Sequence, residues 1–158
     1  MLTRRRILLG VAVLAGLLVV IQAVPYGRDH ANPAPTRSLR YDTARTAQLV
    51  KGACADCHSF DTTWPWYSNV APVSWLVAKD VTDGRDRLNF SRWDQPQPDL
   101  QEVLDVVEGG EMPPLQYKLI HAGARLSDAE SRQLVAGLRR SWLADPPAGT
   151  TSAGGRGG

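Results

Sequence analysis

The stretch Cys54-Ala55-Asp56-Cys57-His58 decides the fold expected for this chain. It contains the only two cysteines among 158 residues, and a histidine directly follows the second one. Cys-x-x-Cys-His is the pattern of c-type haem attachment, in which two thiols form thioethers and the histidine gives an axial nitrogen to the iron. In a helical turn the three side chains lie at i, i+3 and i+4 and share one face. The spacing predicts one covalent haem c per chain, with its iron on His58.

Three other readings of the same stretch are weaker. Zinc prefers about four ligands, and the only other histidines, His30 and His121, do not form a second paired cluster. A thioredoxin-like redox pair expects a βαβ setting that the sequence does not suggest. A disulfide between Cys54 and Cys57 would close a loop too small to stabilise much. Thiol redox chemistry is the strongest of these alternatives.

Length and charge allow one modest domain with appendages. The formal net charge is +2, and hydrophobic residues make up 43% of the chain, which is enough for a core. Three arginines precede residue 7, so acidic residues slightly outnumber basic ones in the rest of the chain. The composition therefore gives no sign of nucleic-acid binding.

Residues 1–24 resemble a signal anchor. Arg4, Arg5 and Arg6 precede an apolar run over residues 7–24, interrupted only by Gln22, and a run of roughly 18 residues is just long enough to cross a bilayer core. A cleaved signal peptide is the alternative, with Ala23 as a small residue at the cut, and the arginines faintly suggest a twin-arginine signal. We expect a single-pass protein of the bacterial cytoplasmic membrane, with its haem domain on the periplasmic side, where the c-type maturation machinery completes attachment.

The remaining chain divides by composition. Residues 25–41 are rich in proline, lack an apolar period and are expected to form an extended linker, with His30 in solvent. Residues 42–144 carry the helical periodicity of the domain. Residues 145–158 are dominated by Gly, Pro, Thr and Ser and are expected to be a disordered tail.

Four helices are expected in residues 42–144. The first begins near Asp42 or Thr43 and runs toward the cysteines, whose thiols continue its apolar face. The second follows Pro72 and carries the inward stripe Val73, Leu76, Val77, Val81 and Leu88. The third opens at Pro98, ends at Gly109-Gly110 and carries Leu100, Val103, Leu104 and Val107. The fourth follows a capping box made by Ser127 and Glu130 and carries Leu134, Val135, Leu138 and Trp142.

Two segments outside these helices are candidates for contact with the haem. Trp64, Trp66 and Tyr67 lie in a proline-broken stretch that is expected to fold against the cofactor. Met112 precedes two prolines that hold the backbone extended, so its sulfur could sit at a fixed point as the sixth iron ligand. A core methionine is the alternative for Met112. His121 is the competing sixth ligand, and an open site is the third possibility.

With these residues in view, the chain resembles the bacterial haem-binding domain proteins of the cytochrome c-like type. The attachment motif is common to all c-type cytochromes. More specific are Thr63-Trp64-Pro65-Trp66-Tyr67-Ser68, Ala71-Pro72-Val73-Ser74-Trp75-Leu76, Leu88-Asn89-Phe90-Ser91 with Trp93, Gly110-Glu111-Met112-Pro113-Pro114, and Ala124-Arg125-Leu126-Ser127. The resemblance implies attachment at Cys54 and Cys57, ligation by His58 and a small all-α, cytochrome c-like domain around one haem, with Met112 as the natural distal ligand. The family also places histidine at the position of His121.

The sequence therefore predicts a membrane-tethered monohaem cytochrome c that passes single electrons between redox partner proteins, the iron supplying the chemistry and the chain its ligands and apolar wall. The first alternative is a haem peroxidase with an open sixth site and His121 as acid and base. The second is a ligand-sensing or redox-sensing module in which residues 1–24 also serve for docking.

Overall fold

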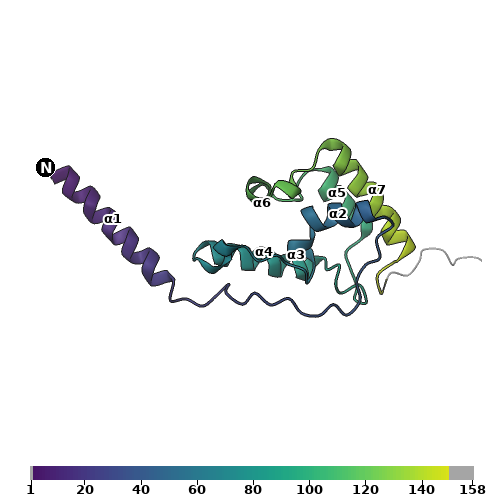
Figure 1. The fold of residues 1–158 in the computed structure, drawn as a ribbon, viewed down its shortest axis with the longest axis horizontal. Helices are drawn as coiled ribbons and strands as arrows, with labels where there is room; N and C mark the ends of the chain where they lie inside the picture. The colour runs from purple at the N-terminus through teal and green to yellow at the C-terminus, as the bar shows by residue number, and fades with distance from the viewer. Residues whose placement is uncertain (1, 150–158) are drawn as a thin grey trace, which may run out of the picture. The chain divides into compact units, whose positions relative to one another are not determined.

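The computed structural model describes residues 2–149, and within this range the fold is all helical (Figure 1). The only β-type pairing among the described residues is an isolated parallel bridge between Arg37 and Arg92. The elements are α1 (Leu2–Ile21), α2 (Ala44–Ala53), α3 (Ala55–His58), η1 (Trp66–Asn69), α4 (Val73–Arg87), α5 (Leu100–Glu108), α6 (Leu115–Ile120), η2 (Ala122–Ala124) and α7 (Asp128–Ala144), where η marks a 3-10 helix. The expected all-α class is confirmed.

The chain forms two compact units. The first contains residues 1–31 and 64–80, and the second contains residues 32–63 and 81–158. The attachment motif, α2, α3, α5, α6 and α7 all belong to the second unit, together with the last residues of α4.

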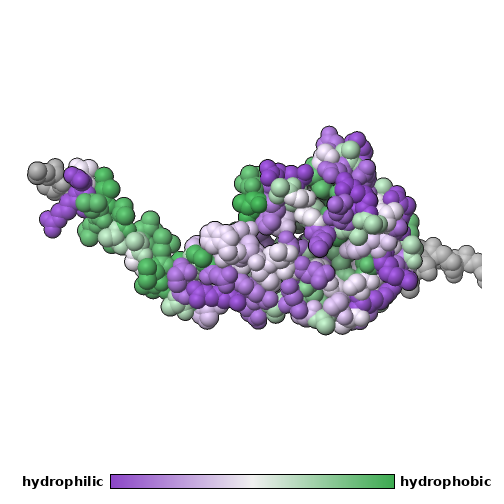
Figure 2. Space-filling model, viewed as in Figure 1, coloured by the Kyte–Doolittle hydropathy of each residue, from purple (hydrophilic) through white to green (hydrophobic). Residues whose placement is uncertain are grey.

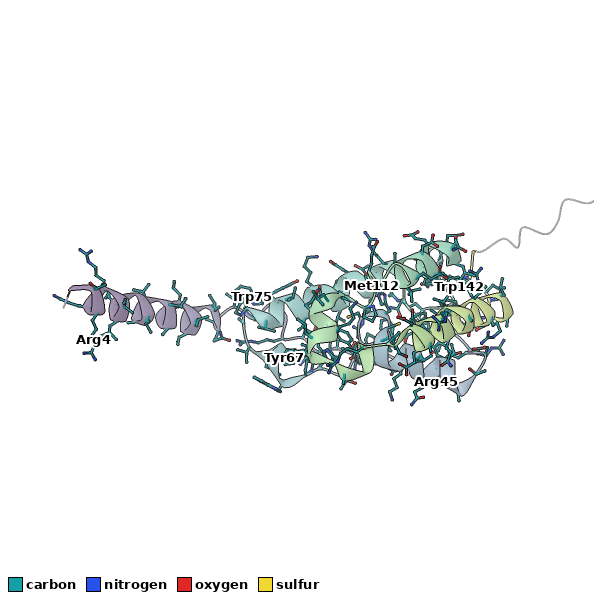
Figure 3. All side chains as sticks on the ribbon, turned by 90° about the horizontal axis from the view of Figure 1, so that it is seen from above. Arg4, Arg45, Tyr67, Trp75, Met112 and Trp142 are labelled. Atoms are coloured by element: carbon teal, nitrogen blue, oxygen red, sulfur yellow. The ribbon has the colours of Figure 1, made fainter. Side chains whose placement is uncertain are left out.

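The core of the second unit is built by α2, α5 and α7, which pack side by side (Figure 1). The four residues predicted to face inward from α7 are all buried: Leu134, Val135, Leu138 and Trp142. The ring of Trp142, labelled in Figure 3, meets that of Trp93 edge to face at a centroid distance of 4.6 Å. Both Trp93 and Trp142 are buried, so this aromatic pair is part of the hydrophobic core.

The helix boundaries of α5 and α7 follow the predicted caps. The Ser127 hydroxyl accepts from the backbone of Glu130, and the Glu130 carboxylate accepts from the backbone of Ser127, which is the expected capping box. Asp99 caps the start of α5, one residue after the predicted Pro98. The helix ends at Glu108 with Gly109 as its C-cap, as the predicted stop at Gly109-Gly110 requires. Thr43 is the N-cap of α2, which confirms one of the two residues proposed for that position.

Three expectations about the helices are wrong. The first helix runs to Ala53 as expected, but the thiols do not continue its apolar face, because Cys54 leaves the helical conformation at φ −128°. In α4, Val73 and Leu76 are exposed although the apolar stripe placed them inside. The short helix α6 was not expected. It buries none of its residues, so its apolar side chains form no inward stripe that a sequence pattern could reveal.

The segment expected to be a tail begins inside the core. Asp145 is only 3% exposed, and its carboxylate pairs with Arg37 and accepts from the backbone N–H of Arg40 at 2.9 Å. Its carbonyl accepts from the indole N–H of Trp93 at 2.6 Å. These bonds join the end of α7 to the segment before α2. Residues 150–158 of the predicted tail lie outside the described residues.

The expected linker also makes specific contacts. Within the first unit, the ring of His30 stacks on Trp64 at 4.5 Å, and His30 Nε2 donates to the carbonyl of Ser68 at 3.1 Å. The side-chain amide of Gln22 donates to the carbonyl of Ala71 and accepts from its N–H. His30 is therefore held by the protein rather than by solvent alone, contrary to the expectation for a linker histidine.

The apolar residues of α1 are exposed around the helix, and Figure 2 shows them gathered along it. Arg4 to Arg6 are part of the same helix, which ends at Ile21, before the end of the predicted apolar run at Val24. In the part of the chain that the structure describes, no helix combines the length and the apolar character needed to cross a membrane. The expected transmembrane helix is therefore not supported.

Candidate functional site

The attachment motif folds as a single helical turn. Cys54 ends α2 and precedes α3, and its carbonyl accepts from the backbone N–H of His58 at 2.9 Å and of Cys57 at 3.2 Å. This bonding places residues 54, 57 and 58 at the i, i+3 and i+4 positions of one turn, as the spacing predicted. The break after Ala53 separates this turn from α2.

The imidazole of His58 is oriented by the end of α4. Its Nδ1 lies 2.9 Å from the carbonyl oxygen of Gly84 and 3.1 Å from that of Leu88. Carbonyl oxygens only accept, so Nδ1 carries the proton and Nε2 keeps its lone pair. A histidine that donates from one nitrogen to a backbone carbonyl has the tautomer and fixed orientation of a metal ligand.

The electrostatic setting also favours a neutral His58. Burial lowers the pKa of its imidazole, and the two carbonyl hydrogen bonds only partly oppose this effect. The backbone carbonyl of His58 accepts from the N–H of Phe90 at 2.8 Å, so the residues that follow α4 hold both its ring and its main chain. The resulting neutral imidazole can bind iron through Nε2.

Both cysteines are in the thiol form, without a disulfide. Burial, together with the nearby Cys57, raises the pKa of the Cys54 thiol to about 12. Reactive redox thiols have lowered pKa values, because the thiolate is the nucleophile. The raised pKa and the helical surroundings thus disfavour the thioredoxin-like alternative.

Gly84 brings α4 into direct contact with the motif. A Cβ atom at this position would lie 2.5 Å from the Cys57 carbonyl oxygen and 3.0 Å from the Cys57 Cβ. Only glycine therefore allows α4 to approach the turn this closely. Next to it, Arg85 donates to the carbonyl of Ser59 at 2.8 Å and strengthens the same contact.

Tyr117 of α6 is a site residue that sequence reasoning missed. Its hydroxyl donates to Asp56 Oδ2 inside the motif at 2.6 Å, and its ring stacks on His121 at 3.9 Å. Burial raises the pKa of Tyr117, and Asp56 raises it further, so the hydroxyl keeps the proton that it donates. No periodic signal marks this residue, because α6 has no inward stripe.

His121 has the same tautomer as His58. Its Nδ1 lies 3.1 Å from the carbonyl of Tyr117, so Nδ1 donates and Nε2 can accept or bind a metal. Through the Tyr117 ring, His121 is connected to the motif. Gly52 of α2 and Gly123 of η2 also lie close together. A Cβ atom at Gly52 would be 3.1 Å from the Gly123 carbonyl oxygen, so glycine at this position allows η2 to pack closely on α2.

Met112 lies in the segment between α5 and α6, in the same unit as the motif (labelled in Figure 3). Its N–H donates to the carbonyl of Val106 at 3.1 Å, and its side chain is 41% exposed. A core methionine would be buried, so the exposure removes the gap-filling alternative. The role of Met112 as a ligand stays a prediction.

The aromatic stretch belongs to the first unit, whereas the motif belongs to the second. Trp64 stacks on His30, Trp66 is 79% exposed, and Tyr67 meets Trp66 edge to face at 5.9 Å. The expected contact of Trp64, Trp66 and Tyr67 with haem stays a prediction.

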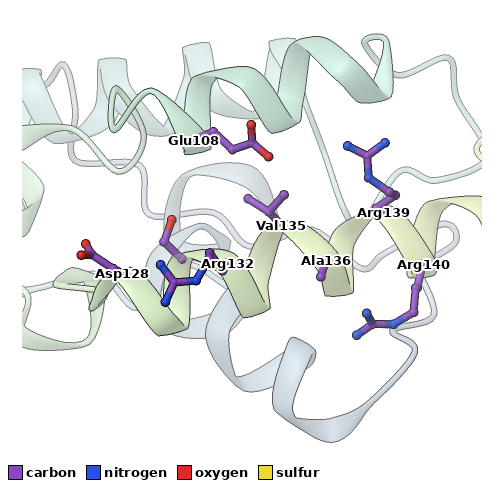
Figure 4. A pocket seen from close by; sticks show the side chains of 8 residues that line it. Glu108, Asp128, Arg132, Val135, Ala136, Arg139 and Arg140 are labelled. Carbon is purple, nitrogen blue, oxygen red and sulfur yellow. The ribbon is translucent and has the colours of Figure 1, made fainter.

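A groove of about 520 Å³ lies between α5 and α7 (Figure 4). It is lined by Glu108, Asp128, Ser131, Arg132, Val135, Ala136, Arg139 and Arg140. These walls are largely charged and include no residue of the attachment motif. The groove therefore contains none of the thiol and imidazole donors predicted to hold the haem.

The motif itself fits haem. Two thiols and an imidazole come from one turn, the imidazole has its metal-binding tautomer, and among the described residues no cluster of three His, Cys, Asp or Glu could hold a metal ion alone. Two thiols and one imidazole are fewer than the four ligands expected of a structural zinc site. They suit an iron that is already held in a porphyrin.

Comparison with known proteins agrees with this geometry. Neither a curated protein nor a solved structure matches the chain. The haem-binding domain family matches residues 16–140, which include the attachment turn, Met112, His121 and most of α7. We therefore conclude that this chain belongs to the haem-binding domain family and that haem is its cofactor.

Proposed function

We propose that the protein is a c-type cytochrome that binds one haem covalently through Cys54 and Cys57 and ligates its iron with His58. The observation that carries this proposal is the His58 ring, whose Nδ1 is fixed by the carbonyls of Gly84 and Leu88 one helical turn from two thiols. A fixed proximal imidazole beside two thiols serves haem attachment and has no use in a disulfide.

Attachment requires only addition chemistry. Cys54 and Cys57 would each hold the haem through a thioether, formed by addition of the S–H bond across one vinyl double bond, with the sulfur on one vinyl carbon and the hydrogen on the other. The step consumes no oxidant, but it needs the c-type maturation machinery to present the haem to reduced thiols.

Electron transfer is the function that these residues support best. When bound, the iron supplies a one-electron couple between its ferric and ferrous states. The chain holds the proximal imidazole in one orientation through its two carbonyl bonds, and this limits the movement that accompanies a change of iron charge. We propose redox proteins as the electron donor and acceptor, and Trp64, Trp66 and Tyr67 as part of the haem wall.

Single cysteine variants test attachment. We expect the chain produced with a c-type maturation system to retain the mass of one haem after denaturation and solvent extraction. Cys54→Ser and Cys57→Ser should each lose one thioether and hold less haem, because a hydroxyl does not replace the sulfur. Mass spectrometry and pyridine haemochrome spectra measure both effects. Normal two-thioether haem in either variant would refute the proposed attachment.

For the sixth ligand we propose Met112, with His121 as the alternative. Met112 is the only methionine besides Met1, and its exposed side chain follows α5 within the unit of the motif. The tautomer of His121 favours this residue as the alternative ligand. Its Nδ1 donates to the Tyr117 carbonyl, so its Nε2 keeps a lone pair. A methionine ligand raises the reduction potential, whereas a second histidine leaves it lower.

The two ligands can be separated with matched variants. If Met112 binds the iron, Met112→Ala abolishes the weak long-wavelength charge-transfer band of the ferric protein and leaves the haem attached. Leu115→Ala, at a residue that is 68% exposed nearby, is the control and should keep the band. A band that is absent in the wild type, together with a spectrum altered by His121→Ala, would assign the site to His121. Rapid cyanide binding by the wild type would instead favour an open, peroxidase-like site.

We also propose that α1 associates the protein with the bacterial cytoplasmic membrane, with the haem domain on the periplasmic side. Support comes from the apolar side chains exposed on α1 and from the arginines at its start. Export of the domain would bring the motif to the compartment in which c-type haem is attached.

A further inference from the structure

The two candidate sixth ligands flank a short helix that is not buried. Helix α6 lies between Met112 and His121 and buries none of its residues. Leu115, Leu119 and Ile120 are 68%, 69% and 62% exposed, and Figure 2 shows them as an apolar patch on the surface. Apolar packing of these residues therefore cannot fix the position of α6.

One side-chain hydrogen bond connects this helix to the haem-attachment turn. The hydroxyl of Tyr117 donates to Asp56 Oδ2 at 2.6 Å, and the second carboxylate oxygen accepts from the backbone N–H of Thr63 at 2.8 Å. Asp56 is therefore held from both sides. Tyr117 in turn stacks on His121 at an interplanar angle of 17°, so the same ring supports a candidate ligand.

We propose that Tyr117 is a positioning residue: its hydrogen bond to Asp56 holds residues 112–121 against the attachment turn and thereby limits access of small ligands to the sixth coordination site. The inference rests on the proposed haem attachment. A short bond between a hydroxyl and a carboxylate is among the stronger hydrogen bonds in proteins, and it is partly buried here. Its loss should let α6 open more often while the haem remains on Cys54, Cys57 and His58.

The test uses Tyr117→Phe in the full chain. The ring keeps its stacking on His121 but loses the donor. We expect imidazole to bind the ferric protein about tenfold faster, since a hydrogen bond to a charged group commonly contributes about one order of magnitude to an equilibrium. We also expect faster hydrogen exchange at the amides of α6, with the amides of α2 and α7 unchanged.

Four further variants complete the test. Asp56→Asn should act in the same direction, and the double variant should exceed the stronger single variant by little, because both remove one interaction. Tyr26→Phe, at a tyrosine that is 56% exposed, and Asp61→Asn, at an exposed carboxylate near the motif, are the controls. We expect wild-type exchange and ligand binding from both.

The outcomes separate the two proposals. Unchanged α6 exchange and unchanged imidazole binding in Tyr117→Phe would overturn the positioning role while leaving haem attachment intact. Faster exchange across α2 and α7 as well would also overturn it, because that result indicates general destabilisation. Failure of the wild type to hold haem would refute the proposed function, and the exchange measurement would still report on the Tyr117 contact.

Discussion

The imidazole of His58 is oriented by two backbone carbonyl oxygens, those of Gly84 and Leu88. Cys54, Cys57 and His58 are recognisable from spacing alone. The carbonyl of Gly84, which accepts from His58 Nδ1, lies 26 residues away in the sequence. Backbone carbonyls have no residue identity, so no sequence pattern marks them. The only available signal was a glycine inside an otherwise amphipathic helix, and the structure explains it by contact with Cys57.

Gly84→Ala tests this contact. Alanine would normally stabilise a helix interior by about 1 kcal/mol relative to glycine. Here its Cβ would lie 2.5 Å from the Cys57 carbonyl oxygen, so α4 has to move away from the motif. We expect the overpacking to outweigh the propensity and lower the free energy of unfolding by about 1–3 kcal/mol. The shifted carbonyl should also change the reduction potential, because it orients His58.

The control is Gly16→Ala, also inside a helix, where no atom lies within 4 Å of the added Cβ. Thermal unfolding and a redox titration measure both variants. A Gly84→Ala protein with wild-type stability and potential would contradict the proposed packing.

For the helices, capping residues predicted the boundaries of α5 and α7 more reliably than apolar periodicity predicted which faces are buried. The capping box at Ser127 and the glycine at the end of α5 placed those helix boundaries to within about a residue, because a cap is a local chemical requirement. Periodicity was correct for α7, whose apolar stripe faces the core. It was wrong for the first turn of α4, and it could not find α6, because apolar residues that stay exposed carry no information about an inward face.

Ser127→Ala tests the cap of α7. The Ser127 hydroxyl accepts from the Glu130 N–H, and its backbone N–H donates to the Glu130 carboxylate. Removal of the hydroxyl leaves a donor of the first turn unsatisfied. We expect a loss of about 1 kcal/mol in the free energy of unfolding, measured by urea denaturation.

Ser131→Ala is the matched control, since it removes a hydroxyl from the next turn of the same helix, where alanine is the better helix former. We expect no loss of stability for this variant. Equal effects of the two changes would contradict a capping role for Ser127.

For the whole molecule, amino-acid composition predicted a linker at residues 25–41 and a tail from residue 145, and contacts in the structure disagree with both. The prolines of residues 25–41 suggested a linker, but Leu39 is buried, and His30 stacks on Trp64 within the first unit. Asp145 was assigned to a tail because of the residues that follow it, yet it is held by Arg37 and Trp93. These contacts join residues more than 30 positions apart in the sequence, so local composition could not predict them.

Replacement of residues 1–21 by a cleavable secretion signal tests the organisation of the chain. All contacts described for His58, Cys57 and Tyr117 lie within residues 32–63 and 81–158, and Gln22 is retained for its bonds to Ala71. We expect the shortened protein to attach haem with the wild-type spectrum and to leave the membrane pellet, since the exposed apolar side chains of α1 have been removed. Ultracentrifugation followed by haem staining measures both results, with the full chain as the control. Loss of haem from an exported, shortened protein would show that α1 supports the site, and retention in the pellet would show that another surface binds the membrane.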